Sequence, residues 1–303
     1  MPRLHPVEFF KQSLKSQSYY ADELINIYLL RPLAAVIVWI LYPMSITPNH
    51  VTIVAVVVGL IAAFAYMQNT PTAIAIAGLL IVAKDILDDA DGQLARAKEL
   101  YSRRGRFLDS IGDVVVNAAL FGAITSVVYQ THPSSMTILL GVLSLLGITL
   151  RVSYHVYYQV SFFHLEDQYK LNRIIEEITE EDRKGDPVAL RLQQIFLIIY
   201  GWQDRLMYRI DQWCMGNKFF LKSPIPNLQS SISGEWYSDR FGLRLSGLLG
   251  FGTEFMLLAV CSWLNELYAY LFLNVFLMNG IWMVSVLFRK LVLRKNLECG
   301  GAR

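Results

Sequence analysis

Charged residues are scarce in this chain, at 17% of its 303 residues against 54% hydrophobic residues. Soluble domains usually carry about a quarter charged residues, so this composition favours an integral membrane protein. The formal net charge is only +2, and no basic domain suggests nucleic acid as a partner. The first 24 residues lack the apolar core of a signal peptide, and we expect them to form a short amphipathic segment at a membrane surface.

Cysteine is also scarce. Cys214, Cys261 and Cys299 lie far apart in the sequence, without the paired spacing of a zinc site or a disulfide framework. Buried structural thiols are therefore the simpler interpretation.

Lysine and arginine are absent from three long windows, residues 32–83, 107–150 and 245–288. Each window has room for two membrane passes of about 20 residues, and each has a short polar break near its middle, namely QNTPT, THPSS and NEL. We therefore predict an all-α, polytopic membrane protein made of three helical hairpins. Its six transmembrane helices are expected at about residues 49–67, 72–98, 105–130, 135–163, 241–264 and 267–291.

Basic residues gather between and after the hairpins. Four of them lie within residues 98–106 and four within residues 289–295. Because positive charge stays on the cytoplasmic side of membrane proteins, we expect both termini and the 98–106 junction to face the cytoplasm. The three polar breaks, which carry no positive charge, should then face outward.

Two segments fall outside the hairpins. The apolar run in residues 25–43 is interrupted by Arg31 and Pro32, which favours an interfacial or re-entrant helix, with a seventh span as the alternative. Residues 164–240 predict a cytoplasmic helical insertion, in which residues 192–213 form a helix resting on the membrane surface. We expect Asp204 and Asp211 of this helix to be surface carboxylates, with a position within reach of the aspartates at 88–113 as the alternative. The predicted organisation is thus an N-terminal segment (1–46), a first helical block with the motif (47–163), the insertion (164–240), and the last two helices with a basic tail (241–303).

Acidic residues gather where two of the predicted helices end, in KDILDDADGQLARAKELYSRRGRFLDSIGDVVVN, residues 84–117. Asp88 and Asp91 are three residues apart, and Asp109 and Asp113 are four apart. Each pair therefore shares one helix face. The 13 residues between Asp91 and Gly105 allow the two helices to turn back and face each other.

Four carboxylates at the ends of two apolar membrane helices require a counter-charge. Burying each carboxylate beside lipid costs roughly 2.5–3.5 kcal/mol of free energy. The four carboxylates also repel one another unless a cation lies among them. Oxygen ligands favour a hard divalent ion, Mg²⁺, Mn²⁺ or Ca²⁺, and four carboxylates suffice for two ions that clamp a diphosphate. For any single carboxylate, the structural alternative is a salt bridge to Lys98 or to one of the neighbouring arginines. Such salt bridges do not explain why four aspartates occur at matched helical spacing on two helices.

The pattern Asp88-x2-Asp91-Gly92-x2-Ala95-Arg96-x8-Gly105-x3-Asp109-x3-Asp113 resembles the signature of the CDP-alcohol phosphotransferase family at all eight fixed positions. The segment TPNHVT at residues 47–52 and the six-span layout are similar too. The insertion at 164–240 is not part of the family's core pattern. Asp85 and Asp89 lie outside the motif, so we expect them to be hydrogen-bonded or solvated.

The resemblance implies transfer of a substituted phosphoryl group from a CDP-alcohol to an acceptor hydroxyl, with release of CMP, in phospholipid biosynthesis. It implies two Mg²⁺ ions, with Mn²⁺ possible, bound by Asp88, Asp91 and Asp109. Asp113 would share one ion and act as general base. The family also implies a homodimer, and together with the charge pattern it places the active site at the cytoplasmic face. The nucleotide-binding residues that we expect are Gly92, Ala95, Arg96, Gly105, Asn49 and Thr52.

The acceptor pocket is expected on the other spans. Arg151 is the only basic residue in the interior of the predicted fourth span, and ionisable residues at such depth are candidates for function. Pairing with Glu254, or with one of the motif aspartates, is the structural alternative. His155 and Glu254 are the further acceptor-binding candidates. Val156 and Tyr158 stand where members with phosphorylated acceptors often carry basic residues, which argues against an inositol-phosphate or glycerol-phosphate acceptor.

Two other functions remain open. CDP-diacylglycerol is the favoured donor, but a CDP-choline or CDP-ethanolamine donor with diacylglycerol as acceptor would use the same motif. A divalent-cation transporter is the alternative of another class. Against it, the carboxylates crowd at one membrane face, and the outer halves of the spans lack matching acids.

Overall fold

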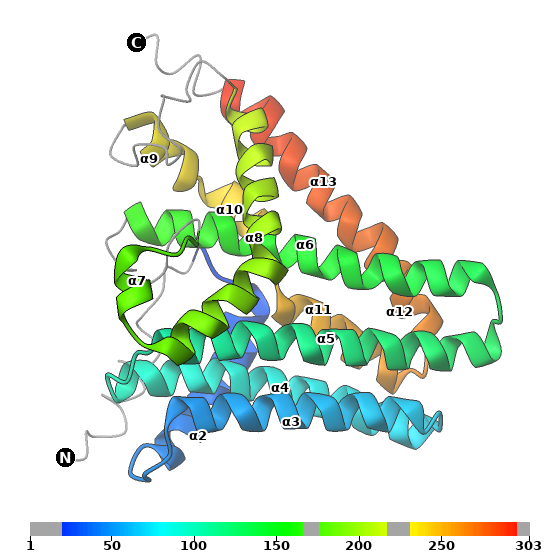
Figure 1. Cartoon of the computed structure of the whole chain (residues 1–303). Coiled ribbons are helices and arrows are strands. Elements are labelled where there is room, and N and C mark those ends of the chain that lie inside the picture. Colours follow the sequence, from blue (N-terminus) through cyan, green and yellow to red (C-terminus); the bar gives the residue numbers. More distant parts are fainter. Residues whose placement is uncertain (1–19, 166–175, 217–230, 296–303) are drawn as a thin grey trace.

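The computed structural model describes residues 20–165, 176–216 and 231–295, and all regular secondary structure in these ranges is helical. The predicted all-α class is confirmed. Long helices lie side by side along one direction, and another long helix, at residues 187–215, crosses them (Figure 1). The expected N-terminal surface segment falls largely in residues 1–19, and Cys299 falls in the C-terminal tail; both lie outside the described residues.

The first two hairpins begin and end close to where the sequence predicts. They consist of α3 (Pro48–Met67), α4 (Pro71–Ala97), α5 (Arg103–Thr131) and α6 (Ser135–Leu165). Local capping fixes the helix starts: the side chain of Thr70 accepts a hydrogen bond from the Ala73 amide, and that of Ser102 accepts one from the Gly105 amide. Such caps satisfy amide groups that have no partner inside the helix.

Five helical segments are long and apolar enough to cross a membrane: Pro48–Met67, Arg103–Thr131, Ser135–Leu165, Gly234–Trp263 and Leu267–Leu293. The multi-pass prediction therefore stands, although a sixth span does not follow from length and composition. Helix α4 has 27 residues and packs against α3, but its second half carries Lys84 and the aspartates of the motif region. Its crossing of the membrane stays a prediction.

The predicted fifth span is two helices rather than one, α10 (Arg240–Gly247) and α11 (Phe251–Trp263). Glu23 from the N-terminal segment explains the break, because its Oε2 accepts a hydrogen bond of 2.9 Å from the Thr253 amide. A Cβ atom at Gly250 would lie only 1.9 Å from Glu23 Oε1. The last predicted span is a continuous rod with π-helical turns, namely α12 (Leu267–Leu273), η2 (Asn274–Met278), α13 (Asn279–Leu287) and η3 (Phe288–Leu293).

The N-terminal apolar run forms η1 (Asn26–Leu30) and α2 (Arg31–Leu41), and α2 packs against α4. Together they make an apolar helix, Asn26–Leu41, that is shorter than the five candidate spans. Its length agrees with the expected interfacial helix, while its position at the membrane stays a prediction. The buried side chains of α2 are Ala34, Ala35 and Val38.

The insertion contains α7 (Glu180–Lys184), α8 (Pro187–Met215) and α9 (Ser231–Tyr237). Helix α8 crosses α5 and α6 and packs against both (Figure 1). The expectation that Asp211 is a surface carboxylate is wrong, because this side chain is fully buried. It accepts hydrogen bonds of 2.6 Å from the Tyr158 hydroxyl, 2.9 Å from Trp236 Nε1 and 2.7 Å from the Tyr237 hydroxyl. Asp211 thus joins α6, α8 and α9.

Candidate active site

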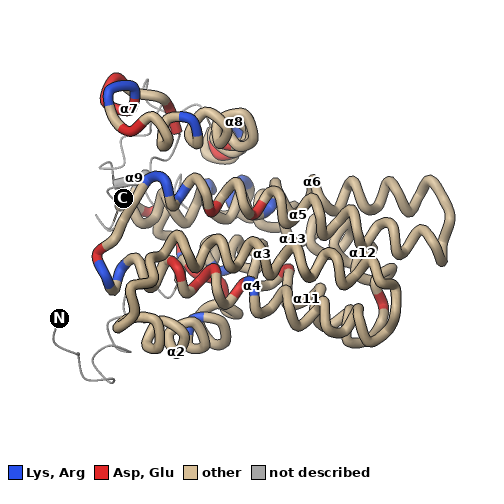
Figure 2. Tube along the Cα trace, turned by 60° about the horizontal axis from the view of Figure 1, so that its bottom comes forward, with Lys and Arg blue, Asp and Glu red and all other residues tan. Residues whose placement is uncertain are grey.

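The acidic site is formed by side chains of α4 and α5 beside α3, which packs against both helices. Asp88 and Asp91 on α4 and Asp109 on α5 each offer one carboxylate oxygen, and these three atoms lie within 4.8 Å of one another. All three side chains are half-buried. The structure therefore brings together three of the four aspartates that the spacing placed on facing helices. Figure 2 shows charged residues gathered toward this end of the helices, while the opposite halves are almost free of them.

The donor set of these three aspartates fits a hard divalent cation. Carboxylate oxygens are the ligands that Mg²⁺, Mn²⁺ and Ca²⁺ prefer, and His and Cys, which zinc favours, do not belong to this group. Thr52 on α3 donates a hydrogen bond from its hydroxyl to Asp91 Oδ2. Such outer contacts orient a ligand before the ion binds. Thr52, which the sequence predicts near the nucleotide, thus lies directly beside the acidic group.

Asp113, the fourth motif aspartate, contacts a residue that the sequence reasoning missed. Lys84 Nζ lies 2.5 Å from Asp113 Oδ1 and 3.5 Å from Asp88 Oδ2. Lys84 is 1% exposed and Asp113 is 8% exposed. The available signal was position: Lys84 directly follows the first window without basic residues and precedes Asp88 by one helical turn. A lysine placed there faces the same side as Asp88.

The expected nucleotide-binding residues border the acidic group on α3, α4 and α5. A Cβ atom at Gly105 would lie 2.6 Å from Asn49 Oδ1, so glycine lets the first turn of α3 approach α5. At Gly92, an added Cβ would meet Arg96 Nη1 at 3.5 Å and, among the described residues, no other atom within 4 Å apart from its chain neighbours and the backbone of its own helix, which leaves room beside the backbone. Ala95 is half-buried in the last turn of α4.

Arg96 also lies within electrostatic reach of the N-terminal segment. Burial raises the pKa of Asp22 above its ordinary value, while the charges of Arg31 and, more weakly, Arg96 oppose this shift. Asp22 and Arg31 form an ion pair, and Gln93 Nε2 donates a hydrogen bond of 3.2 Å to the Arg31 carbonyl. The N-terminal segment therefore packs beside the motif-bearing end of α4.

Two of the acceptor-binding candidates, Arg151 and Glu254, form an ion pair with each other, which was the structural alternative for Arg151. Arg151 Nη2 donates to Glu254 Oε2 at 2.9 Å, and both side chains are almost fully buried. Arg151 Nη1 also donates to Asn279 Oδ1 at 2.6 Å, and Glu254 Oε1 accepts from the Tyr270 hydroxyl at 2.9 Å. His155 lies one turn after Arg151 and is 4% exposed. A role for these three residues in acceptor binding stays a prediction.

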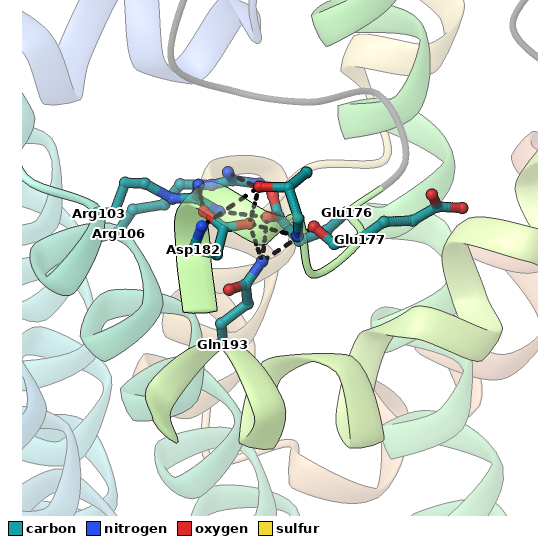
Figure 3. Close-up of polar contacts among 7 residues, drawn as sticks. Arg103, Arg106, Glu176, Glu177, Asp182 and Gln193 are labelled. Atoms are coloured by element: carbon teal, nitrogen blue, oxygen red, sulfur yellow. Dashed lines mark hydrogen bonds and ion pairs between the residues drawn. The ribbon is translucent and has the colours of Figure 1, made fainter. Parts of the chain in front are cut away.

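A polar network, which we call the α5 clamp, joins the start of α5 to the insertion (Figure 3). Glu176 is its centre: Oε1 accepts from Arg103 Nη2 at 2.5 Å and from Gln193 Nε2 at 2.8 Å, and Oε2 accepts from Arg106 Nη1 at 2.9 Å. Arg103 also pairs with Asp182. Because Arg103 and Arg106 lie on either side of Gly105 and within two helical turns of Asp109, the clamp holds the part of α5 that carries the motif.

Tyr200 of α8 also contacts the part of α5 that carries the motif. Its hydroxyl donates a hydrogen bond of 2.9 Å to the Ser110 carbonyl. Burial raises the pKa of Tyr200, and the nearby charges of Asp113 and Asp109 raise it further. The insertion therefore borders the site, a contact that no local sequence pattern indicated.

Comparison with known proteins identifies relatives of this chain. It is 34% identical over 110 residues to a protein of Thermococcus kodakarensis named bifunctional IPC transferase and DIPP synthase, covering 36% of this chain and 24% of the relative. A protein of the same name from Archaeoglobus fulgidus is 38% identical over 85 residues, covering 28% of this chain and 16% of the relative. The archaetidylinositol phosphate synthase of Pyrococcus horikoshii is 40% identical over 81 residues, covering 26% and 41%. The chain thus spans less than half the length of each of these relatives.

A sequence profile of the CDP-alcohol phosphatidyltransferase family matches residues 45–216. The match includes every motif aspartate, and it runs through α8, although the sequence motif had placed the insertion outside the family's core pattern. Because the matched residues make up more than half of the 303 in the chain, the protein belongs to the CDP-alcohol phosphatidyltransferase family.

Proposed function

We propose that this protein transfers a substituted phosphoryl group from a CDP-alcohol to the hydroxyl of an acceptor alcohol, with release of CMP. The observation that carries this proposal is the group formed by Asp88, Asp91 and Asp109, whose oxygens lie within 4.8 Å of one another inside the segment that matches the family. Such a group suits a reaction in which cations stabilise the charge of a diphosphate.

In this proposal, Asp88, Asp91 and Asp109 hold Mg²⁺, with Mn²⁺ as a substitute and two ions in the complete site. The bound metal supplies positive charge to the diphosphate and to the departing CMP. Asp113 accepts the proton of the acceptor hydroxyl as its oxygen bonds to phosphorus and the bond between phosphorus and the CMP oxygen breaks. Arg96 binds phosphate, and Gly92, Ala95, Gly105, Asn49 and Thr52 shape the nucleotide pocket.

The favoured donor is CDP-diacylglycerol, since the chain has five helical segments long and apolar enough to cross a membrane, and a lipid donor resides in a membrane. One relative is named archaetidylinositol phosphate synthase, which makes an inositol phosphate a necessary acceptor to test. Val156 and Tyr158 on α6 provide no positive charge for a phosphorylated acceptor. We further propose that the site faces the cytoplasm, because the 98–106 junction beside it is basic, and that two copies associate as a dimer.

The decisive experiment is a CMP-release screen with the purified protein in lipid nanodiscs. CDP-diacylglycerol is paired with serine, glycerol phosphate, inositol and an inositol phosphate, and CDP-choline and CDP-ethanolamine are paired with diacylglycerol. We expect CMP from one donor class only, and only with Mg²⁺ or Mn²⁺ present. A protein that releases no CMP from any pair, yet carries Mn²⁺ into liposomes, would instead be a transporter.

A further inference from the structure

Lys84 places a buried ammonium group inside an acidic site whose known signature contains no lysine. Its Nζ lies 2.5 Å from Asp113 Oδ1 and 3.5 Å from Asp88 Oδ2. The first distance is a short, charge-assisted hydrogen bond, and the second is an ion pair without a hydrogen bond. One lysine thus contacts an aspartate of α5 and an aspartate of α4 at the same time.

The surroundings of Lys84 leave its ammonium little freedom to move elsewhere. The rings of Phe251 and Phe255 on α11 have their centroids 5.7 Å and 5.5 Å from Nζ, distances at which aromatic faces attract a cation. On the other side, α3 approaches so closely that a Cβ atom at Gly59 would lie 3.4 Å from Lys84 Cγ. A buried ammonium without acidic partners is strongly unfavourable, so Lys84 stays with the aspartates.

These contacts divide the four motif aspartates into two roles. Asp113 is held through Oδ1, which leaves Oδ2 as the oxygen that can accept a proton. Asp88 belongs both to the group of oxygens within 4.8 Å of one another and to the ion pair with Lys84. A divalent cation bound by that group would therefore share Asp88 with the ammonium and be repelled by it.

We propose that Lys84 is a positioning residue of this site: it fixes Asp113 through one oxygen and shares Asp88 with the catalytic cation. The proposal rests on the proposed function for its effect on rate. Its effect on metal binding is independent of the reaction.

The proposal predicts changes of opposite sign when the ammonium is removed. Loss of the positive charge removes a repulsion, so the cation binds more tightly. Loss of the hydrogen bond frees the Asp113 carboxylate, so the transfer becomes slower. A lysine that only stabilises the fold would weaken metal binding and activity together.

The experiment compares Lys84→Met and Lys84→Gln with the control Lys184→Met, which removes one charge from the exposed end of α7. Mn²⁺ affinity is measured without substrate, from the electron paramagnetic resonance signal of free Mn²⁺, in protein purified in nanodiscs. CMP release is measured at saturating metal. We expect Mn²⁺ to bind about tenfold more tightly to both Lys84 variants and CMP release to fall about 100-fold in Lys84→Met. Lys84→Gln, whose amide still donates to Asp113, should lose less activity, and Lys184→Met should change neither quantity.

Unchanged or weaker Mn²⁺ binding in Lys84→Gln overturns the proposal, provided that its thermal unfolding midpoint stays close to that of the wild type. If Lys84→Met does not fold, Lys84→Gln alone decides. Tighter Mn²⁺ binding with an unchanged rate of CMP release also overturns it, because Asp113 would then need no positioning. A wild-type protein without CMP release contradicts the proposed function, and the Mn²⁺ measurement still decides whether Lys84 shares the acidic group with the ion.

Discussion

Asp113 stands apart from the other motif aspartates, since it contacts Lys84 and does not belong to the group of oxygens within 4.8 Å. We therefore expect Asp113→Asn to lower CMP release by about 10²–10⁴-fold, the usual contribution of a general base, while Mn²⁺ binding persists. Asp109→Asn is the matched change on the same helix and should weaken Mn²⁺ binding as well. Both quantities are measured on the same nanodisc samples. Full activity of Asp113→Asn would remove this residue from the role of base.

Arg151 and Glu254 form a buried ion pair in which each side chain has further hydrogen-bond partners. Breaking such a pair leaves an uncompensated charge, so Arg151→Met should destabilise the protein by about 3–5 kcal/mol. The double variant Arg151→Met, Glu254→Met should recover part of this loss. Thermal unfolding midpoints in detergent and the acceptor KM test the prediction. An increased acceptor KM with an unchanged midpoint would instead place Arg151 in the acceptor pocket.

Single residues were predictable where helical periodicity decides their position. The three- and four-residue spacings of the motif were sufficient to expect that Asp88, Asp91 and Asp109 meet, and their oxygens do lie close together. Lys84 was missed because its partner Asp113 belongs to another helix. The sequence around Lys84 alone does not indicate a contact between side chains of two helices. The burial of Asp211 was missed for the same reason, since its hydrogen-bond partners Tyr158 and Trp236 come from α6 and α9.

Among the elements, the α5 clamp connects the insertion to the helix that carries half of the motif. Glu176 is 3% exposed and binds both Arg103 and Arg106. We expect Glu176→Ala to loosen the contact of α7 and α8 with α5, because two arginines lose a shared carboxylate. Trypsin should then cleave faster after Arg183 and Lys184, which lie exposed on α7.

The control for this change is Glu181→Ala, which removes an exposed carboxylate from α7. It should leave the cleavage rate close to that of the wild type. Reduced CMP release in Glu176→Ala alone would show that the clamp also positions the motif on α5. Equal cleavage of both variants would mean that other contacts, such as the hydrogen bond from Tyr200 to Ser110, hold the insertion in place.

The boundaries of the helices were predictable where capping residues and polar breaks set them, as at Thr70 and Ser102. The break between α10 and α11 was not, because it depends on Glu23, more than 200 residues earlier in the chain. Residues 248–250 contain only leucine and glycine, and such a sequence is compatible with a continuous membrane helix. A distant side chain decided the local conformation there.

At the scale of the whole molecule, the absence of lysine and arginine from long windows predicted the hairpins. That signal works because a charge within the bilayer is expensive wherever it occurs in the sequence. It also explains why α4 does not qualify as a span by composition, since the residues of the site occupy its second half. Figure 2 shows that the charged residues gather toward one end of the long helices, while the other end is almost free of them. The direction in which this end faces stays a prediction from charge.

Helix α8 remains the element whose relation to the membrane can be tested most sharply. Among its exposed apolar side chains, Ile195, Ile198 and Trp202 recur at three- and four-residue intervals. Its exposed charged residues are Arg191, Arg205 and Arg209. The two acids of α8, Asp204 and Asp211, are half-buried and buried. An exposed helix face that combines arginine with isoleucine and tryptophan fits the headgroup region of an anionic bilayer.

We therefore expect a nitroxide at Ile198→Cys, a position that is 79% exposed, to lie at the membrane surface. The label is introduced in a background in which the native cysteines are serines, and its collisions with oxygen and with a water-soluble nickel chelate are compared in anionic nanodiscs. Leu146→Cys on the exposed side of α6 reports the bilayer interior, and Lys184→Cys on α7 reports water. Ile198 should fall between these two references, because an interfacial helix buries its apolar face only about 5–10 Å deep. A value equal to that of Lys184 would mean that α8 lies off the bilayer, and its apolar face would then require a protein partner.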